Sequence, residues 1–149
     1  MKIFKPKNLL ILLIVMFIII QFVPVERTNP PQNAPIAVTG DVAQIMKSAC
    51  YDCHSNTTVW PWYSHVAPVS WILSDHVRNG RRHLNFSAWN EYSKKKKLKK
   101  LDEIVEEIEK GNMPLAGYVK LHSEADLSTD QKQKLIAWAN AAMDTASLK

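Results

Sequence analysis

The sequence has little of several features that mark other classes of protein. It contains only two cysteines, which excludes a small domain held together by several disulfides. Four glycines and eight prolines in 149 residues exclude a collagen-like or low-complexity chain. Neither a strand-like alternation of useful length nor an internal repeat occurs. Because 46% of the residues are hydrophobic and 22% are charged, wholesale disorder is excluded and one modest domain is expected.

The chain carries little excess charge once its first residues are set aside. Lys2, Lys5 and Lys7 are three of the 19 basic residues, which leaves 16 basic residues against 14 acidic ones. Phosphate contacts need many lysines and arginines, so this balance argues against a nucleic-acid partner. The lysine run at residues 94–97 could dock an acidic partner, although a solvated helix face is the simpler role.

The N-terminus has the pattern of a membrane signal. Three lysines precede the unbroken apolar run 9–20, and apolar character continues to Val25 with only Gln21 and Pro24 interrupting it. This length is at the lower limit for a bilayer-spanning helix. Because no small-residue cleavage site follows, residues 1–25 are predicted to be an uncleaved anchor and transmembrane helix. The rest of the chain would then lie on the periplasmic side of the cell membrane.

Helical spacing of apolar residues predicts an all-α domain with long loops. Residues 26–38 contain three prolines and few bulky side chains, and they are predicted to form an extended tether. The domain proper is then residues 39–149. Helices are expected at 41–50, 69–77 and 93–110, and Ser128 begins a capping box for a last helix. Asn79-Gly80 and Gly111 are expected to end the second and third helices.

Both cysteines belong to one short motif, Cys50-Tyr51-Asp52-Cys53-His54. C-x-x-C-H is the attachment signature of c-type haem. Two thiols on one turn can each bond a vinyl group of the same porphyrin, and the histidine that follows can bind the iron. We therefore predict one covalent haem c, with Cys50 and Cys53 as thioether residues and His54 as the proximal ligand.

Three other roles for the cysteine pair were weighed. A thioredoxin-like redox pair would begin a helix within a βαβ pattern, which is not visible here. A zinc site would need a fourth ligand, and the other histidines are not at zinc-finger spacing. A lone disulfide would leave His54 without a role.

The candidates for the sixth iron ligand are one methionine and four histidines. Met113 lies on an irregular segment, 111–114, where a proline follows it and where a loop could hold its thioether against the iron. Met46 and Met143 lie within helical patterns and are expected in the core. Met113 is therefore the leading candidate, ahead of the histidines His65, His76, His83 and His122.

Residues near the motif are candidates for the wall of a haem pocket. Trp62, in an aromatic-rich stretch, could lower the local dielectric constant, and Arg81 could pair with the haem propionates. For Trp62 the simpler alternative is ordinary core packing, and for Arg81 it is an exposed charge. The carbonyl of Pro61 or Pro68 could accept a hydrogen bond from the second ring nitrogen of His54.

The order helix, C-x-x-C-H, loops, helix, Met-Pro and C-terminal helix resembles a small class I c-type cytochrome. More closely, the chain resembles the bacterial haem-binding domain family of membrane-anchored monohaem proteins. The similarity lies in CYDCHSNTTVWPWYSHVAPVSW, DHVRNGRRHLNFSAW and GNMPLAGYVKLHSEADLS, and covers about residues 38–142. The resemblance implies the same thioether residues and proximal histidine, with Met113 as the distal ligand.

The expected function is electron transfer outside the cytoplasm, with redox proteins as partners. A haem iron with both axial positions filled has no position left for a substrate. The alternatives are a five-coordinate haem sensor or peroxidase-like enzyme, in which His65 or His76 could act as a distal base, and a non-haem C-x-x-C redox or interaction module.

Overall fold

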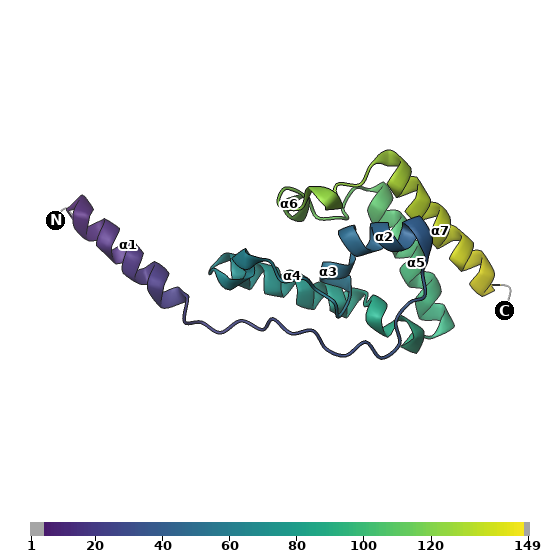
Figure 1. Ribbon diagram of the computed structural model, residues 1–149, viewed down its shortest axis with the longest axis horizontal. Coiled ribbons are helices and arrows are strands. Elements are labelled where there is room, and N and C mark those ends of the chain that lie inside the picture. The colour runs from purple at the N-terminus through teal and green to yellow at the C-terminus, as the bar shows by residue number, and fades with distance from the viewer. Residues whose placement is uncertain (1–4, 148–149) are drawn as a thin grey trace.

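Every regular element that the computed structural model describes is a helix, in agreement with the expected all-α class. The described part of the chain is residues 5–147. Seven α-helices and three short 3-10 helices follow one another along it (Figure 1). The α-helices are α1 (Pro6–Ile20), α2 (Gly40–Ala49), α3 (Tyr51–His54), α4 (Val69–His83), α5 (Lys94–Glu109), α6 (Ala116–Val119) and α7 (Thr129–Ser147). The 3-10 helices are η1 (Trp62–His65), η2 (Phe86–Glu91) and η3 (Ser123–Ala125).

The N-terminal apolar run forms α1, which is shorter than predicted. It has 15 residues, none of them buried, and ends at Ile20. At 1.5 Å per residue such a helix covers about 22 Å, whereas a bilayer core is about 30 Å thick. Within residues 5–147 no helix combines the length and apolarity needed to cross a membrane. The predicted transmembrane helix is therefore wrong, and so is the single-pass membrane location that depended on it.

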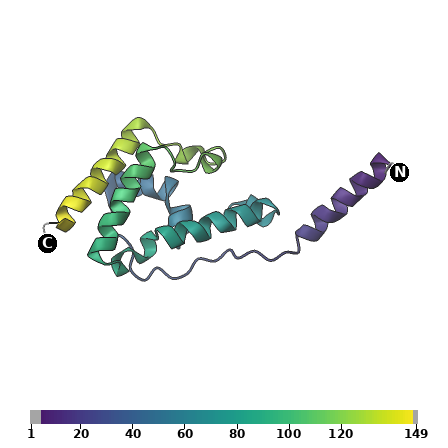
Figure 2. The ribbon, with the colours of Figure 1, turned by 180° about the vertical axis from the view of Figure 1, so that it is seen from behind.

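The segment predicted to be a tether is extended, but it lies against the domain along much of its length (Figure 2). We call residues 26–38 the strap. The hydroxyl of Ser74 on α4 donates to the carbonyl of Glu26 at 2.8 Å, and Arg27 donates to the carbonyl of Ser64 on η1 at 3.1 Å. Farther along, the amides of Ala34 and Ile36 donate to carbonyls of η2. The strap thus joins η1, α4 and η2 from outside.

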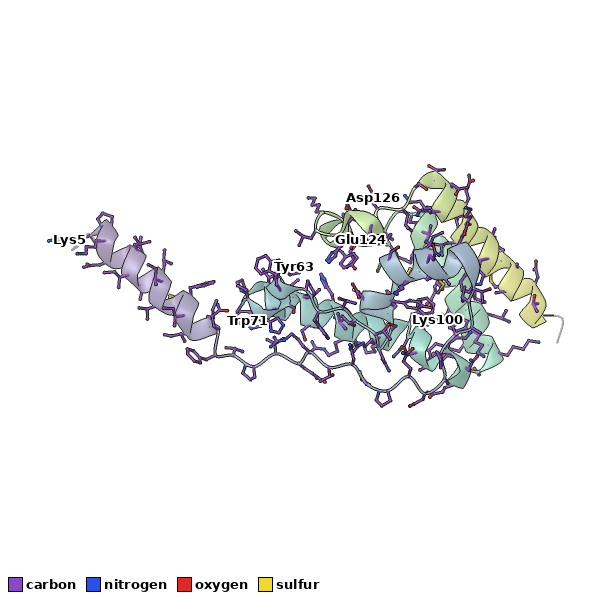
Figure 3. All side chains as sticks on the ribbon, in the orientation of Figure 1. Lys5, Tyr63, Trp71, Lys100, Glu124 and Asp126 are labelled. Atoms are coloured by element: carbon purple, nitrogen blue, oxygen red, sulfur yellow. The ribbon has the colours of Figure 1, made fainter. Side chains whose placement is uncertain are left out.

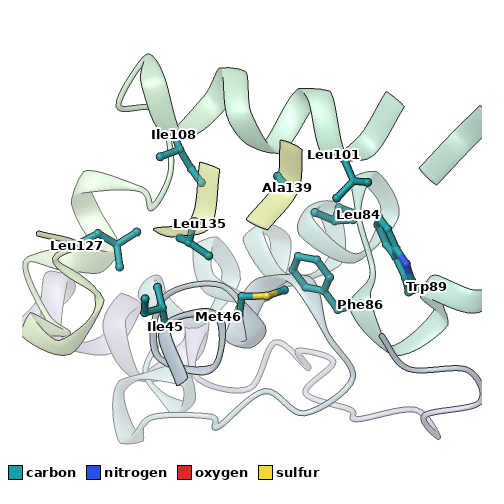
Figure 4. Packing of buried hydrophobic residues seen from close by; sticks show 10 residues of the cluster. All are labelled: Ile45, Met46, Leu84, Phe86, Trp89, Leu101, Ile108, Leu127, Leu135 and Ala139. Atoms are coloured by element: carbon teal, nitrogen blue, oxygen red, sulfur yellow. The ribbon is translucent and has the colours of Figure 1, made fainter. Parts of the chain in front are cut away.

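The hydrophobic core lies where α2, α5, α7 and the segment around η2 meet (Figure 4). The amphipathic helices α5 and α7 pack along each other, and α2 crosses beside them. Met46 on α2 is only 1% exposed, as its helical position predicted. The buried cluster comprises Ile45, Met46, Leu84, Phe86, Trp89, Leu101, Ile108, Leu127, Leu135 and Ala139.

Local capping signals account for the ends of α5 and α7. The hydroxyl of Ser93 accepts a hydrogen bond from the amide of Lys96 at the start of α5. Gly111 has a φ of +69°, the left-handed conformation that glycine adopts readily after a helix. Before α7, Ser128 and Gln131 form the predicted capping box, each backbone amide donating to the other's side chain.

Helix α4 continues beyond the stop expected at Asn79-Gly80 and ends at His83. Gly80 lies where α4 packs against α3. A Cβ atom at this position would come within 2.4 Å of the carbonyl oxygen of Cys53. The glycine is therefore inside the helix because the contact with α3 leaves no room for a side chain.

Candidate functional site

The C-x-x-C-H motif occupies a short helical turn between α2 and α4. Cys50 is the C-cap of α2 and the N-cap of α3, and Cys53 and His54 are the last two residues of α3. Both cysteines are free thiols and are partly buried. One helical turn thus carries two thiols and one imidazole, as the spacing in the sequence predicted.

The His54 ring is held from behind by the C-terminal end of α4. Its Nδ1 lies 3.1 Å from the carbonyl oxygen of Gly80 and 3.1 Å from that of Leu84. Carbonyl oxygens only accept hydrogen bonds, so Nδ1 carries the proton and Nε2 keeps its lone pair. This arrangement is the one in which a histidine serves as a metal ligand, with its other nitrogen bonded to a backbone carbonyl.

The partners of His54 are not those predicted. Neither Pro61 nor Pro68 supplies the carbonyl; Gly80 and Leu84, 26 and 30 residues after the histidine, supply it instead. Burial lowers the pKa of His54, against the opposing effect of the two carbonyl hydrogen bonds. The neutral imidazole that results is the form that binds metal.

Two cavities meet at His54. The first, which we call the apolar cavity, has a volume of about 130 Å³ and is lined by core residues such as Met46, Phe86 and Leu135 together with Cys50. The second, the main cavity, has a volume of about 580 Å³ and lies between α3, α4, α5 and the segment that follows α5. Cys53 lines the main cavity. The two thiols therefore face different parts of one hollow region around the histidine.

Met113 lines both cavities, as His54 does. Its backbone is fixed by the end of α5, because the amides of Asn112 and Met113 both donate to the carbonyl of Glu107, at 3.0 and 3.2 Å. The methionine therefore approaches the cavity from α5, whereas α4 holds the rear of the His54 ring. The structure brings together the four residues predicted to hold a haem: Cys50, Cys53, His54 and Met113.

The four candidate histidines fall into two pairs. His76 lines the main cavity and His83 lines both cavities. Both are on α4, the helix whose backbone binds Nδ1 of His54. His65 and His122 line neither cavity. His122 instead stacks on Tyr118, with ring centroids 4.0 Å apart.

Trp62 and Arg81 are not brought to the cavities. The Trp62 side chain is 79% exposed, on η1. Arg81 points to the other side of α4, where its guanidinium donates to the carbonyls of Ser55 and Thr28 at 2.7 and 2.8 Å. It also donates to the side chains of Asn29 and Thr58, at 2.8 Å each. Arg81 thus joins the strap to the residue directly after His54.

One wall of both cavities carries charge that the sequence did not reveal as part of a site. Lys100 on α5 has a side chain only 13% exposed and contacts Glu103 at 2.5 Å. That hydrogen bond lowers the pKa of Glu103. Glu107, one turn further along α5, also lines both cavities. From the 3.6-residue period of a helix, the sequence could have predicted that these residues share one face of α5. It could not have predicted that this face lies toward the C-x-x-C-H turn.

The environment of the two thiols disfavours thiolate chemistry. Burial, followed by the neighbouring Cys53, raises the pKa of Cys50 to about 12. Burial and Asp52 raise the pKa of Cys53 to about 11, against the opposing effect of Arg81. Redox-active C-x-x-C pairs have lowered thiol pKa values instead. Within residues 5–147, no three side chains of His, Cys, Asp or Glu are grouped so as to hold a metal ion.

The residues fit a haem in three respects. The main cavity has a volume within the range of small-molecule cofactor sites, and the adjoining apolar cavity would exclude water from a porphyrin. The histidine presents a neutral Nε2, and a thioether lies in the wall of the same hollow. These features are those of a small helical protein whose C-x-x-C-H turn faces a hollow region of cofactor size.

The sequence matches the model of the haem-binding domain family over residues 15–141, which is most of the chain. The chain belongs to this family, and haem is its cofactor. A comparison with curated proteins and a comparison with solved structures each gave no match. The similarity to a class I cytochrome therefore stays a prediction.

Proposed function

We propose that this chain is a c-type electron-transfer protein that binds one haem covalently through Cys50 and Cys53. His54 is the proximal ligand of the iron and Met113 the distal ligand. The observation that carries the proposal is the state of His54. Its Nδ1 donates to the carbonyls of Gly80 and Leu84, and the two cavities that it lines are each lined by one of the two thiols.

Covalent attachment is favoured by the placement of the two thiols. Cys50 lines the apolar cavity and Cys53 the main cavity, and both cavities are also lined by His54, so these three residues would hold one haem together. The raised pKa values of the thiols oppose a disulfide-exchange function, because exchange requires a thiolate. The haem supplies the redox chemistry of its iron; the chain holds it in place and tunes its potential.

Each axial residue has a defined role. The carbonyls of Gly80 and Leu84 fix the tautomer and orientation of His54, and they make the lone pair of its Nε2 more basic and so a better metal ligand. The Met113 thioether would be the second protein ligand of the iron, and a methionine ligand would raise the reduction potential. With His54 and Met113 both as ligands, a bound haem would exchange electrons with redox partner proteins and would have no position left for a substrate.

The optical spectrum of the full chain, produced with haem-attachment enzymes, tests this proposal. We expect a low-spin haem in both oxidation states, with the weak long-wavelength charge-transfer band of sulfur-ligated ferric iron. A low-spin spectrum without that band would indicate that a histidine, not Met113, is the second ligand. His76 and His83 are the candidates that line the main cavity. A high-spin spectrum with rapid carbon monoxide binding would instead indicate a five-coordinate sensor or a peroxidase-like enzyme.

A further inference from the structure

The segment after Met113 contributes Pro114, Leu115 and Tyr118 to the wall of the main cavity, yet it is bound to the rest of the domain by few polar contacts. Residues 114–126 include α6 and η3, and α6 lies across from α4 (Figure 1). Among the hydrogen bonds of residues 5–147, only two side-chain links join this segment to other parts of the chain. One runs from Tyr118 to Asp52, and the other from His122 to Tyr63.

The first link attaches the segment directly to the C-x-x-C-H turn. Asp52 is the residue between Tyr51 and Cys53, and its two carboxylate oxygens have separate partners. Oδ1 accepts the backbone amide of Val59 at 2.8 Å, and Oδ2 accepts the Tyr118 hydroxyl at 2.6 Å. Because the carboxylate is already fixed by Val59, it gives Tyr118 a rigid acceptor. Hydrogen bonds to a charged acceptor are stronger than those between neutral groups.

The second link is joined to the first by a ring contact. The Tyr118 and His122 rings are stacked, with an interplanar angle of 19°. The Tyr63 hydroxyl then lies 3.2 Å from Nε2 of His122. Tyr63 is on η1, on the side of α4 that faces α6 (Figure 3). Both links therefore pass through the Tyr118–His122 pair, and the one to Asp52 holds it against the proximal side of the site.

We propose that Tyr118 and Asp52 are positioning residues for the distal ligand, because their hydrogen bond keeps the segment after Met113 closed over the main cavity. The inference rests on the proposed function and adds the residues that hold Met113 in place. Tyr118 itself lines the main cavity, together with Pro114 and Leu115, which follow the methionine. Loss of the bond frees this stretch from α3, and the thioether then leaves the iron more often.

The test is Tyr118→Phe in the haem-loaded full chain. This variant keeps the ring that stacks on His122 and removes only the hydroxyl. We expect covalent haem to be retained and the sulfur–iron band to weaken. The rate of carbon monoxide binding to ferrous haem should rise about tenfold, which is the size of effect expected when one hydrogen bond to a charged group is lost. Asp52→Asn, which removes the charge of the acceptor, should change both readouts in the same direction by a smaller factor.

Tyr92→Phe is the matched control, because it removes a phenol hydroxyl that accepts the amide of Asn85 at 3.0 Å and has no link to residues 114–126. Carbon monoxide rates that are equal in Tyr118→Phe and Tyr92→Phe, with an unchanged sulfur–iron band, would overturn the inference while leaving the proposed function intact. Absence of the sulfur–iron band in the unsubstituted protein would overturn the methionine ligand, and this inference with it.

Discussion

The carbonyl oxygen of Gly80 lies 3.1 Å from Nδ1 of His54, and the absence of a side chain at Gly80 is what allows this approach. A Cβ at residue 80 would lie 2.4 Å from the carbonyl oxygen of Cys53, on the turn that carries the histidine. The same glycine therefore supplies the hydrogen-bond acceptor and the space that the acceptor needs. Through it, the C-terminal end of α4 fixes the ring of His54, the proposed proximal ligand.

Gly80→Ala should separate α4 from α3 and weaken the hold on His54. Overpacking a tight contact costs about 1–3 kcal/mol, from which the better helix propensity of alanine recovers about 1 kcal/mol. We expect a lower free energy of unfolding in urea and a changed reduction potential. Gly117→Ala is the matched control, because a Cβ at that position has no atom within 4 Å. Equal potentials and stabilities for the two variants would contradict the role given to Gly80.

Met113→Ala should leave the haem covalently bound and open its distal position. The sulfur–iron band should disappear, the reduction potential should fall, and ferrous haem should bind carbon monoxide, because the thioether no longer fills the position and no longer favours ferrous iron. His76→Ala and His83→Ala remove the two other candidates that line the main cavity, and they should do none of this. An unchanged spectrum in Met113→Ala, with an open iron in either histidine variant, would assign the distal position to that histidine.

Arg81→Ala should loosen the strap where it passes α4. The guanidinium makes four hydrogen bonds, to Ser55, Thr28, Asn29 and Thr58. Their loss should cost about 2–4 kcal/mol of unfolding free energy, because hydrogen bonds of charged groups contribute more than neutral ones. Faster amide hydrogen exchange should follow at residues 55–58, where Arg81 bonds the backbone of Ser55. Arg82→Ala, on the exposed part of the same helix, should leave both measurements unchanged.

Glu103→Gln should make the domain less sensitive to acid. The hydrogen bond from Lys100 lowers the pKa of Glu103 below its usual 4.5, so the folded state binds fewer protons at this group than the unfolded state. The stabilisation is therefore present above about pH 4.5 and is lost as the pH falls through the lowered pKa. Because the Glu103 side chain is 38% exposed, we expect no more than about 1 kcal/mol. Urea unfolding at neutral and at acid pH measures this contribution. If the unsubstituted protein and Glu103→Gln lose the same free energy of unfolding at acid pH, the contribution of Glu103 is excluded.

Features encoded by a few adjacent residues were predictable from the sequence. Ser128 and Gln131 marked the start of α7, and Gly111 marked the end of α5 because of its conformation. The C-x-x-C-H turn is itself a local motif, and it forms one helical turn as expected. In each case the signal and the structure that it specifies lie within one turn of helix.

Features that depend on contacts between distant segments were not predictable in this way. Gly80 was interpreted as a helix stop because its role as a close contact with α3 is invisible without the second helix. Arg81 was interpreted as a cavity residue, whereas the face of α4 on which it lies is bound by the strap. The apolar run suggested a transmembrane helix, but α1 ends at Ile20, since composition alone does not fix where a helix stops.

The mass of the intact, denatured protein tests the central claim most directly. Full chain produced with haem-attachment enzymes should carry the added mass of one haem, because two thioether bonds survive denaturation. Replacing Cys50 and Cys53 together by alanine should remove that added mass, whereas Met113→Ala should retain it. An unsubstituted protein with no added mass, or a double cysteine variant that keeps it, would contradict covalent attachment at this motif.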